Sequence, residues 1–137
     1  MPREVFLSHS NLNRAIADQV ANVLRNNTVP VWYSHVNIIG ARQWHDEIGN
    51  ALNRCDWFIV LLSPESVQST WVKRELLFAL NHRQYENHII PVLINDCDIA
   101  DLSWTLELFE IVDLTILNAA SYANLFRVWG LGFNGIL

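Results

Sequence analysis

The stretch that decides the fold is Trp57-Phe58-Ile59-Val60-Leu61-Leu62, six apolar residues in a row. A run of this length without polar alternation is typical of a strand buried on both faces, as in a parallel sheet covered by helices. Ser63-Pro64 follows directly and predicts that the strand ends there. We therefore expect residues 57–62 to form the central strand of an α/β domain.

The sequence on either side of this run alternates between strand-like and helix-like segments. Short apolar runs predict four further strands, at residues 4–8, 29–33, 88–94 and 111–114. Apolar residues at helical spacing predict helices at 12–24, 44–52, 70–83 and 119–129, whereas 95–103 resembles a loop. Such alternation predicts a flavodoxin-like, doubly wound, five-stranded parallel sheet of order 2-1-3-4-5 with helices on both faces. Residues 1–137 are expected to form a single domain.

The predicted strand order also indicates where a ligand would bind. In doubly wound sheets the binding crevice lies beyond the carboxyl ends of the strands, where the order reverses between strands one and three. The residues expected around this crevice are Ser8, His9, Ser10, Ser63 and the loop 34–40.

Composition and charge argue against several classes of partner. The net charge is −5, so the chain lacks the basic surface that binds nucleic acid. The longest apolar run, 57–62, is far shorter than the ~20 residues of a membrane-spanning helix, so no membrane partner is expected. Cys55 and Cys97, without a signal peptide, indicate reduced thiols and a cytoplasmic location.

The predicted helix 70–83 carries an aromatic residue and an acid, Trp71 and Glu75, one turn apart. Phe78 extends this stripe, which is separate from the apolar stripe that begins at Val72. In one interpretation, Trp71 packs locally and Glu75 pairs with a cation on the helix surface. In the other, an acid held between aromatic groups has a shifted pKa and stands beside a stacked planar ligand. The expected position of this helix next to the crevice favours the second interpretation.

Familiar active-site motifs are absent from the sequence. It contains neither G-x-G-x-x-G nor G-x-x-x-x-G-K-[ST], the two motifs that hold nucleotide phosphates, and no G-x-S-x-G nucleophile motif. The five histidines are scattered without the spacing of metal ligands, so no metal site is expected. The dinucleotide-binding, P-loop and α/β-hydrolase classes are therefore disfavoured.

Three groups of residues carry a resemblance to a known family. They are residues 5–10 (VFLSHS), residues 40–51 with Trp44 and Ile48, and residues 58–64 (FIVLLSP) followed by Ser69, Trp71, Arg74, Glu75 and Leu76. Over essentially its whole length the chain resembles a TIR domain (Toll/interleukin-1 receptor homology). The pattern is closest to bacterial and plant-like members of that family.

The resemblance implies an NAD+ glycohydrolase or cyclase that releases nicotinamide together with ADP-ribose or a cyclic ADP-ribose. It implies that Glu75 is the catalytic residue and that Trp71 packs on the dinucleotide. It further implies substrate contacts from Ser8, His9, Ser10, Ser34, Ser63 and, through a phosphate, Arg42. NAD+ is then the substrate, and no cofactor is expected. The setting implied is prokaryotic immune defence, with a downstream effector that senses the nucleotide product.

The chemistry of this bond explains why one acid could suffice. Cleavage of an N-glycosidic bond passes through an oxocarbenium-like transition state, which a carboxylate stabilises. The nicotinamide is already a cationic pyridinium and departs neutral, so no second carboxyl is needed to protonate it. Because the sequence offers no buried partner for Glu75, we expect this residue on the surface of its helix.

Two other functions remain open. A non-catalytic TIR scaffold would act by homotypic self-association alone, and the presence of Glu75 argues against it only modestly. A nucleoside deoxyribosyltransferase-like enzyme shares the strand order and a catalytic glutamate but acts on neutral nucleosides. Enzymatic TIR relatives often carry an acid after the second strand, where this chain has Ser34-His35, so substrate affinity and product type stay open.

The loop 34–40 is expected to mediate self-association, because Val36, Ile38 and Ile39 are apolar and Gly40 provides a hinge. Apolar side chains on a loop contribute little to the stability of a monomer. Replacing Ile38 and Ile39 with Asp is expected to reduce assembly and activity together, with the melting temperature nearly unchanged. Light scattering measures the assembly, and an unaltered particle size in the double variant would contradict this assignment.

Overall fold

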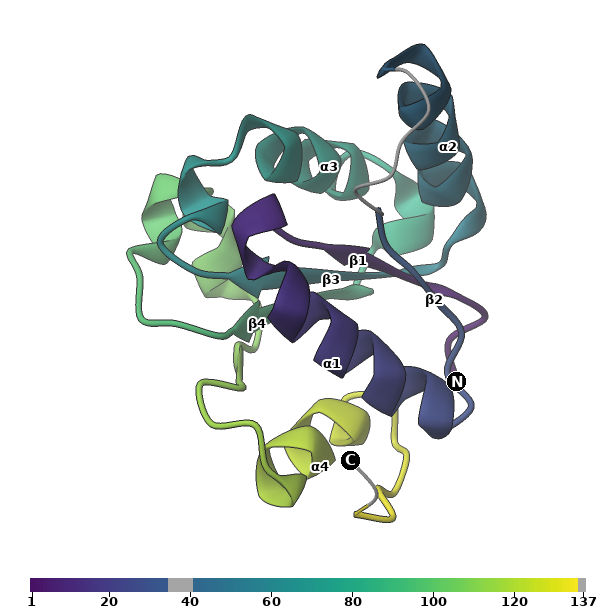
Figure 1. The fold of residues 1–137 in the computed structure, drawn as a ribbon, viewed down its shortest axis with the longest axis vertical. Coiled ribbons are helices and arrows are strands. Elements are labelled where there is room, and N and C mark those ends of the chain that lie inside the picture. Colours follow the sequence, from purple (N-terminus) through teal and green to yellow (C-terminus); the bar gives the residue numbers. More distant parts are fainter. Residues whose placement is uncertain (35–40, 136–137) are drawn as a thin grey trace.

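A computed structural model describes residues 1–34 and 41–135, with the backbone alone for residues 41–44. The described residues form a five-stranded parallel sheet in the order β2-β1-β3-β4-β5 (Figure 1). Its strands are β1 (Val5–Ser8), β2 (Val31–Trp32), β3 (Trp57–Leu62), β4 (Ile89–Leu93) and β5 (Val112–Asp113). The predicted sheet order is confirmed, and β3 is the central strand, paired with β1 on one side and β4 on the other.

Four α-helices of the described chain cover the two faces of this sheet. They are α1 (Arg14–Asn26), α2 (Ala41–Arg54), α3 (Thr70–Leu80) and α4 (Ala119–Arg127). Helices α1 and α4 pack on one face, and α2 and α3 pack on the other (Figure 1). This layering is the flavodoxin-like arrangement expected from the sequence, and among the described residues no helix is long and apolar enough to cross a bilayer.

The central strand supplies side chains to both hydrophobic cores in strict alternation. Ile59 and Leu61 join the core under α1 and α4, whereas Phe58, Val60 and Leu62 join the core under α2 and α3. Successive side chains of a strand point to opposite faces, so a strand covered on both sides must be apolar throughout. The uninterrupted run at 57–62 follows from this requirement.

Most element boundaries differ from the sequence-based prediction by one to three residues, and two differences stand out, one at the end of α3 and one between β4 and β5. Helix α3 ends at Leu80, three residues before the predicted end at Arg83, because Asn81 Nδ2 donates to the Leu77 carbonyl and His82 Nδ1 bonds the Phe78 carbonyl. These side chains satisfy carbonyls that a longer helix would have used. Between β4 and β5, the segment expected to be a loop contains a short 3₁₀ helix, η4 (Ile99–Asp101), and a second, η5 (Trp104–Leu108), follows it.

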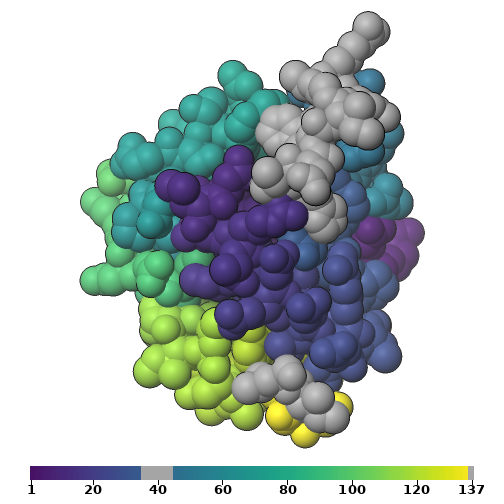
Figure 2. All heavy atoms as spheres, viewed as in Figure 1, coloured from purple at the N-terminus to yellow at the C-terminus, as the bar shows by residue number. Residues whose placement is uncertain are grey.

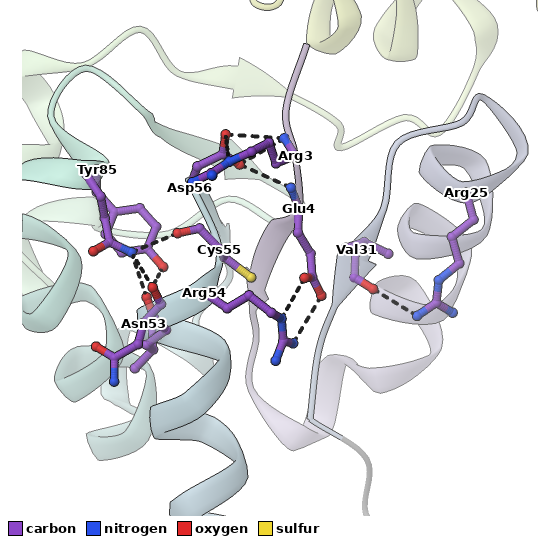
Figure 3. A network of polar contacts seen from close by, with 11 residues as sticks. Arg3, Glu4, Arg25, Val31, Asn53, Arg54, Cys55, Asp56 and Tyr85 are labelled. Atoms are coloured by element: carbon purple, nitrogen blue, oxygen red, sulfur yellow. Dashed lines mark hydrogen bonds and ion pairs between the residues drawn. The ribbon is translucent and has the colours of Figure 1, made fainter.

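Polar contacts tie the elements together at the amino ends of the central strands (Figure 3). The Asp56 carboxylate accepts hydrogen bonds from the backbone N–H groups of Arg3 and Glu4, and Arg54 bonds the Glu4 carboxylate at 2.7 Å. The Gln84 amide donates to three carbonyls at the end of α2, those of Leu52, Asn53 and Cys55. These contacts hold the end of α2 and the start of β3 against β1.

A second polar cluster lies at the carboxyl end of β3. Ser63, fully buried, donates its hydroxyl hydrogen to Asn13 Oδ1 at 2.6 Å and accepts a hydrogen bond from the backbone N–H of Ser66. Ser66 Oγ in turn accepts from the Ser63 N–H at 2.8 Å. The cluster fastens the start of α1 and the 3₁₀ helix η2 (Ser66–Gln68) to the end of the central strand.

Replacing Ser63 with Ala is expected to destabilise the domain by about 1–3 kcal/mol, because the buried Asn13 oxygen and Ser66 N–H then lose their partner. Urea unfolding followed by circular dichroism measures the change. Ser121→Ala, at a half-buried helix position, serves as the control and is expected to stay within about 0.5 kcal/mol of the wild type. Equal stability of the two variants would contradict a structural role for the Ser63 hydroxyl.

Candidate functional site

The last residue of β1, Ser8, places its hydroxyl next to helix α3. Within β1, Phe6 belongs to the core under α2 and α3, while Val5 and Leu7 belong to the opposite core. Alternation along the strand therefore directs Ser8 to the α3 side. Figure 2 shows residues that follow β1, in purple, beside the α3 region, in teal.

Ser8 meets Glu75 at this position. The Ser8 hydroxyl donates a hydrogen bond to Glu75 Oε1 at 2.7 Å, and the two residues are only 1% and 7% exposed. The expectation that Glu75 lies on the helix surface was wrong. Val72, Glu75, Leu76 and Ala79 are the buried residues of α3 and recur at the three- and four-residue spacing of a single helix face. Glu75 therefore belongs to the buried stripe of the helix.

Burial changes the acid strength of this carboxyl. Loss of solvent raises the pKa of Glu75 from 4.5 to about 7, and the hydrogen bond from Ser8 opposes this rise by favouring the charged form. Near neutral pH the site therefore contains a carboxyl group poised between its neutral and ionised forms. Such a group can stabilise a positive charge that develops beside it, and a shift of this kind is a common property of functional sites.

Trp71 lies one turn before Glu75 and is half-buried. The guanidinium carbon of Arg74 stands 5.4 Å from the centre of its ring, and the His45 ring of α2 lies 6.2 Å away at an interplanar angle of 60°. The indole is thus held between side chains of two helices. The interpretation that Trp71 packs locally is supported. The interpretation that Glu75 pairs with a surface cation is not, because Arg74 stands over the Trp71 ring and Glu75 is bonded by Ser8.

His9 follows Ser8 but turns to the other side of the sheet. Its ring lies edge-on to Tyr33 at 5.9 Å, and its Nδ1 bonds the Ser10 carbonyl at 2.8 Å. Burial lowers the pKa of His9, and the carbonyls of Ser10 and Ser34 oppose this effect. His9 therefore favours its neutral form.

Ser10 and Ser63 have structural partners. Ser10 caps the 3₁₀ helix η1 (Asn11–Asn13), because its hydroxyl accepts from the Leu12 N–H, and Ser63 belongs to the buried cluster with Asn13 and Ser66. Their hydroxyls are thereby engaged in holding the loops around the crevice. The structure thus brings Ser8 and Glu75 into contact, places Trp71 one turn away, and directs His9, Ser10 and Ser63 to other partners.

Several expected residues cannot be placed. Val36, Ile38, Ile39 and Gly40 lie outside the described residues, as does the side chain of Arg42. Ser34 is half-buried next to His9. Within residues 1–34 and 41–135, no three His, Cys, Asp or Glu side chains gather so that they could hold a metal ion.

Sequence reasoning missed Asn13, Ser66 and the contact between Tyr33 and Asp18. The Tyr33 hydroxyl donates to Asp18 Oδ1 at 2.7 Å, which joins the end of β2 to α1. A polar residue before a helix is typical of a helix cap, so the sequence around Asn13 did not predict its contact with Ser63. The one available signal was the position of Ser66, three residues after Ser63, a spacing typical of local turn hydrogen bonds.

The raised pKa of Glu75 predicts how stability depends on pH. A carboxyl with a raised pKa in the folded state adds most stability below pH 4.5, its unfolded value, and loses that contribution as the pH rises through about 7. Glu75→Gln removes this dependence. The variant is expected to match the wild type near pH 5 and to exceed it at pH 8 by up to about 3 kcal/mol.

Chemical unfolding of both proteins at the two pH values measures this difference. Glu107→Gln, at an exposed position, is the control and is expected to leave the pH dependence as in the wild type. Parallel stability curves for Glu75→Gln and the wild type would show that the carboxyl has an ordinary acid strength.

Comparison with known proteins identifies the family. The sequence profile of the TIR domain matches residues 5–126. A bacterial relative, the 2' cyclic ADP-D-ribose synthase BtTIR of Bacteroides thetaiotaomicron, is 30% identical over 74 residues, which are 53% of this chain and 26% of that protein. The chain thus matches only about a quarter of the length of this curated relative.

Solved structures agree with the fold. The TIR domain of the Toll-related receptor TRR-2 from Hydra magnipapillata has a TM-score of 0.72 and 18% identity, over 90% of this chain and 94% of that one. A TIR-STING receptor from C. gigas has a TM-score of 0.66 and 21% identity, over 80% of this chain and 34% of that one. Since the profile spans all the strands of the sheet and nearly all of the four helices, the chain belongs to the TIR domain family.

Proposed function

We propose that this domain cleaves the nicotinamide–ribose bond of NAD+ and releases nicotinamide with ADP-ribose or a cyclic ADP-ribose. The observation that carries the proposal is the buried Glu75 carboxyl at the carboxyl edge of the sheet, whose pKa burial raises to about 7. The name of the bacterial relative, a cyclic ADP-ribose synthase, supports the same substrate class.

The charge of the substrate complements this carboxyl. The nicotinamide ring of NAD+ is cationic, and during cleavage the positive charge moves to the ribose as an oxocarbenium ion. A cation beside a carboxyl favours the ionised form, so substrate binding would shift Glu75 towards the carboxylate. That carboxylate then faces the developing charge in a site with little water, where electrostatic stabilisation is strongest. The Ser8 hydrogen bond offsets part of the cost of burying the ionised acid, and the rest is offset only when the cation is present.

The other residues have supporting roles in this proposal. Trp71 offers an aromatic surface one turn from Glu75, and Arg74 stands against its ring. Arg42 is proposed to contact a phosphate, and Ser34 and His9 to border the crevice. Ser10 and Ser63 are proposed to act through the loops that they hold, since their hydroxyls already have partners within the protein.

Homotypic self-association is proposed to accompany the activity. The loop with Val36, Ile38, Ile39 and Gly40 is its proposed contact, on the grounds of sequence alone. A cytoplasmic location, a role in prokaryotic defence and a downstream effector that senses the product belong to the same proposal.

The decisive experiment compares nicotinamide release by the wild type and by Glu75→Gln under identical assembly conditions. The amide retains the shape of the side chain and an acceptor for Ser8 but removes the negative charge. Turnover is expected to fall at least ~100-fold, the scale seen when one electrostatic stabiliser is lost.

Glu107→Gln, which changes an exposed glutamate, provides the matched control and is expected to keep wild-type turnover. Equal rates for the wild type and Glu75→Gln would remove Glu75 from the mechanism. Absence of release from the wild type in every assembly state would favour the non-catalytic scaffold.

A further inference from the structure

The Ser8 hydroxyl occupies a position that the sheet fixes. Ser8 is the last residue of β1 and pairs with Val60 of the central strand. With 1% of its surface exposed, its side chain has little room for another orientation. A donor on a rigid strand holds its partner more accurately than a donor on a loop.

This hydroxyl is a neutral partner for a buried acid. Buried carboxylates are usually paired with a cation, which stabilises the charge but also neutralises it. Within the described residues, the causes that act on the pKa of Glu75 are burial, which raises it, and the Ser8 hydrogen bond, which lowers it. Ser8 thus favours the ionised form while the negative charge remains available to a cationic ligand.

The charged groups that the structure describes on the surrounding elements do not favour the ionised form of Glu75 in place of Ser8. His9 follows β1, Arg14 begins α1, His45 lies on α2, Glu65 precedes η2, and Lys73 and Arg74 lie on α3 itself. None of these described groups is among the causes that shift the pKa of Glu75. Arg74 stands over the Trp71 ring instead, and His45 also contacts that ring.

We propose that Ser8 is a positioning residue that fixes Oε1 of Glu75 and favours the ionised form of this carboxyl, leaving the second oxygen for the substrate cation. The role of Ser8 in catalysis rests on the proposed function, whereas its effect on the pKa of Glu75 does not. The contact itself, 2.7 Å between two buried atoms, gives it a test that needs no turnover.

The first measurement is a titration of the Glu75 carboxyl by carbon-13 NMR in protein labelled at glutamate side chains. Comparison with Glu75→Gln assigns the signal. Ser8→Ala is expected to raise the titration midpoint by about one to two pH units, because a hydrogen bond to the charged form is lost. Ser8→Cys, with a weaker donor of similar size, is expected to give a midpoint between those of Ser8→Ala and the wild type.

Ser63→Ala is the matched control, since it removes a buried hydroxyl at the end of the neighbouring strand whose hydrogen-bond partners are Asn13 and Ser66. Its Glu75 midpoint is expected to equal that of the wild type. The same midpoint in wild type, Ser8→Cys and Ser8→Ala would overturn the proposal, and so would an equal shift in Ser63→Ala. If Ser8→Ala does not fold, the shift in Ser8→Cys decides.

The second measurement is the pH profile of nicotinamide release. Ser8→Ala is expected to lose about tenfold in rate at pH 7 and to approach the wild type at alkaline pH, where Glu75 is ionised in both. A merely structural role would lower the rate equally at every pH, and that result would contradict the proposal. If the wild type releases no nicotinamide, the proposed function fails, and the NMR titration alone decides the role of Ser8.

Discussion

The pairing of β1 with β3 in the middle of the sheet is the constraint on which the rest of the structure depends. It places the ends of the two strands side by side, with Ser8 opposite Val60. Because both faces of the sheet are covered, the direction of each side chain is set by its position along the strand. Ser8 therefore turns to α3, while Ser63, after the neighbouring strand, turns to Asn13 of η1.

The same constraint creates a conflict between stability and chemistry. The helix face that packs on the sheet includes Glu75, where an apolar residue would bury surface without a desolvation cost. The Ser8 hydroxyl, a neutral donor, offsets part of that cost. Residues that lower the stability of the fold in this way are expected at sites that bind or transform a ligand. A buried carboxylate without a cation is stabilised fully only when the ligand brings a positive charge next to it.

The sequence allowed much of the fold to be predicted, for identifiable reasons. The strand at 57–62 is bounded by Asp56 and Ser63, and the start of α3 by the capping residue Ser69, so local signals define these elements. The hydrophobic pattern predicted that Glu75 lies on the exposed side of α3, whereas it is buried. Such a pattern identifies buried positions by their apolar residues and therefore cannot identify a buried acid. The contact between Ser8 and Glu75 joins residues 67 positions apart, and only the assembled sheet reveals it.

The anchoring of α2 has a mechanical consequence. Among the side chains of α2 that the structure describes, Ile48 is the first that is buried, and the last carbonyls of the helix are held by Gln84 and by the Tyr85 hydroxyl, 2.6 Å from the Leu52 oxygen. The helix is therefore anchored at its carboxyl end, and its amino-terminal half carries the exposed His45, whose ring contacts Trp71 of α3. A partner that bound this exposed half of α2 would therefore meet the indole of Trp71 through His45, at a distance from the anchored end of the helix.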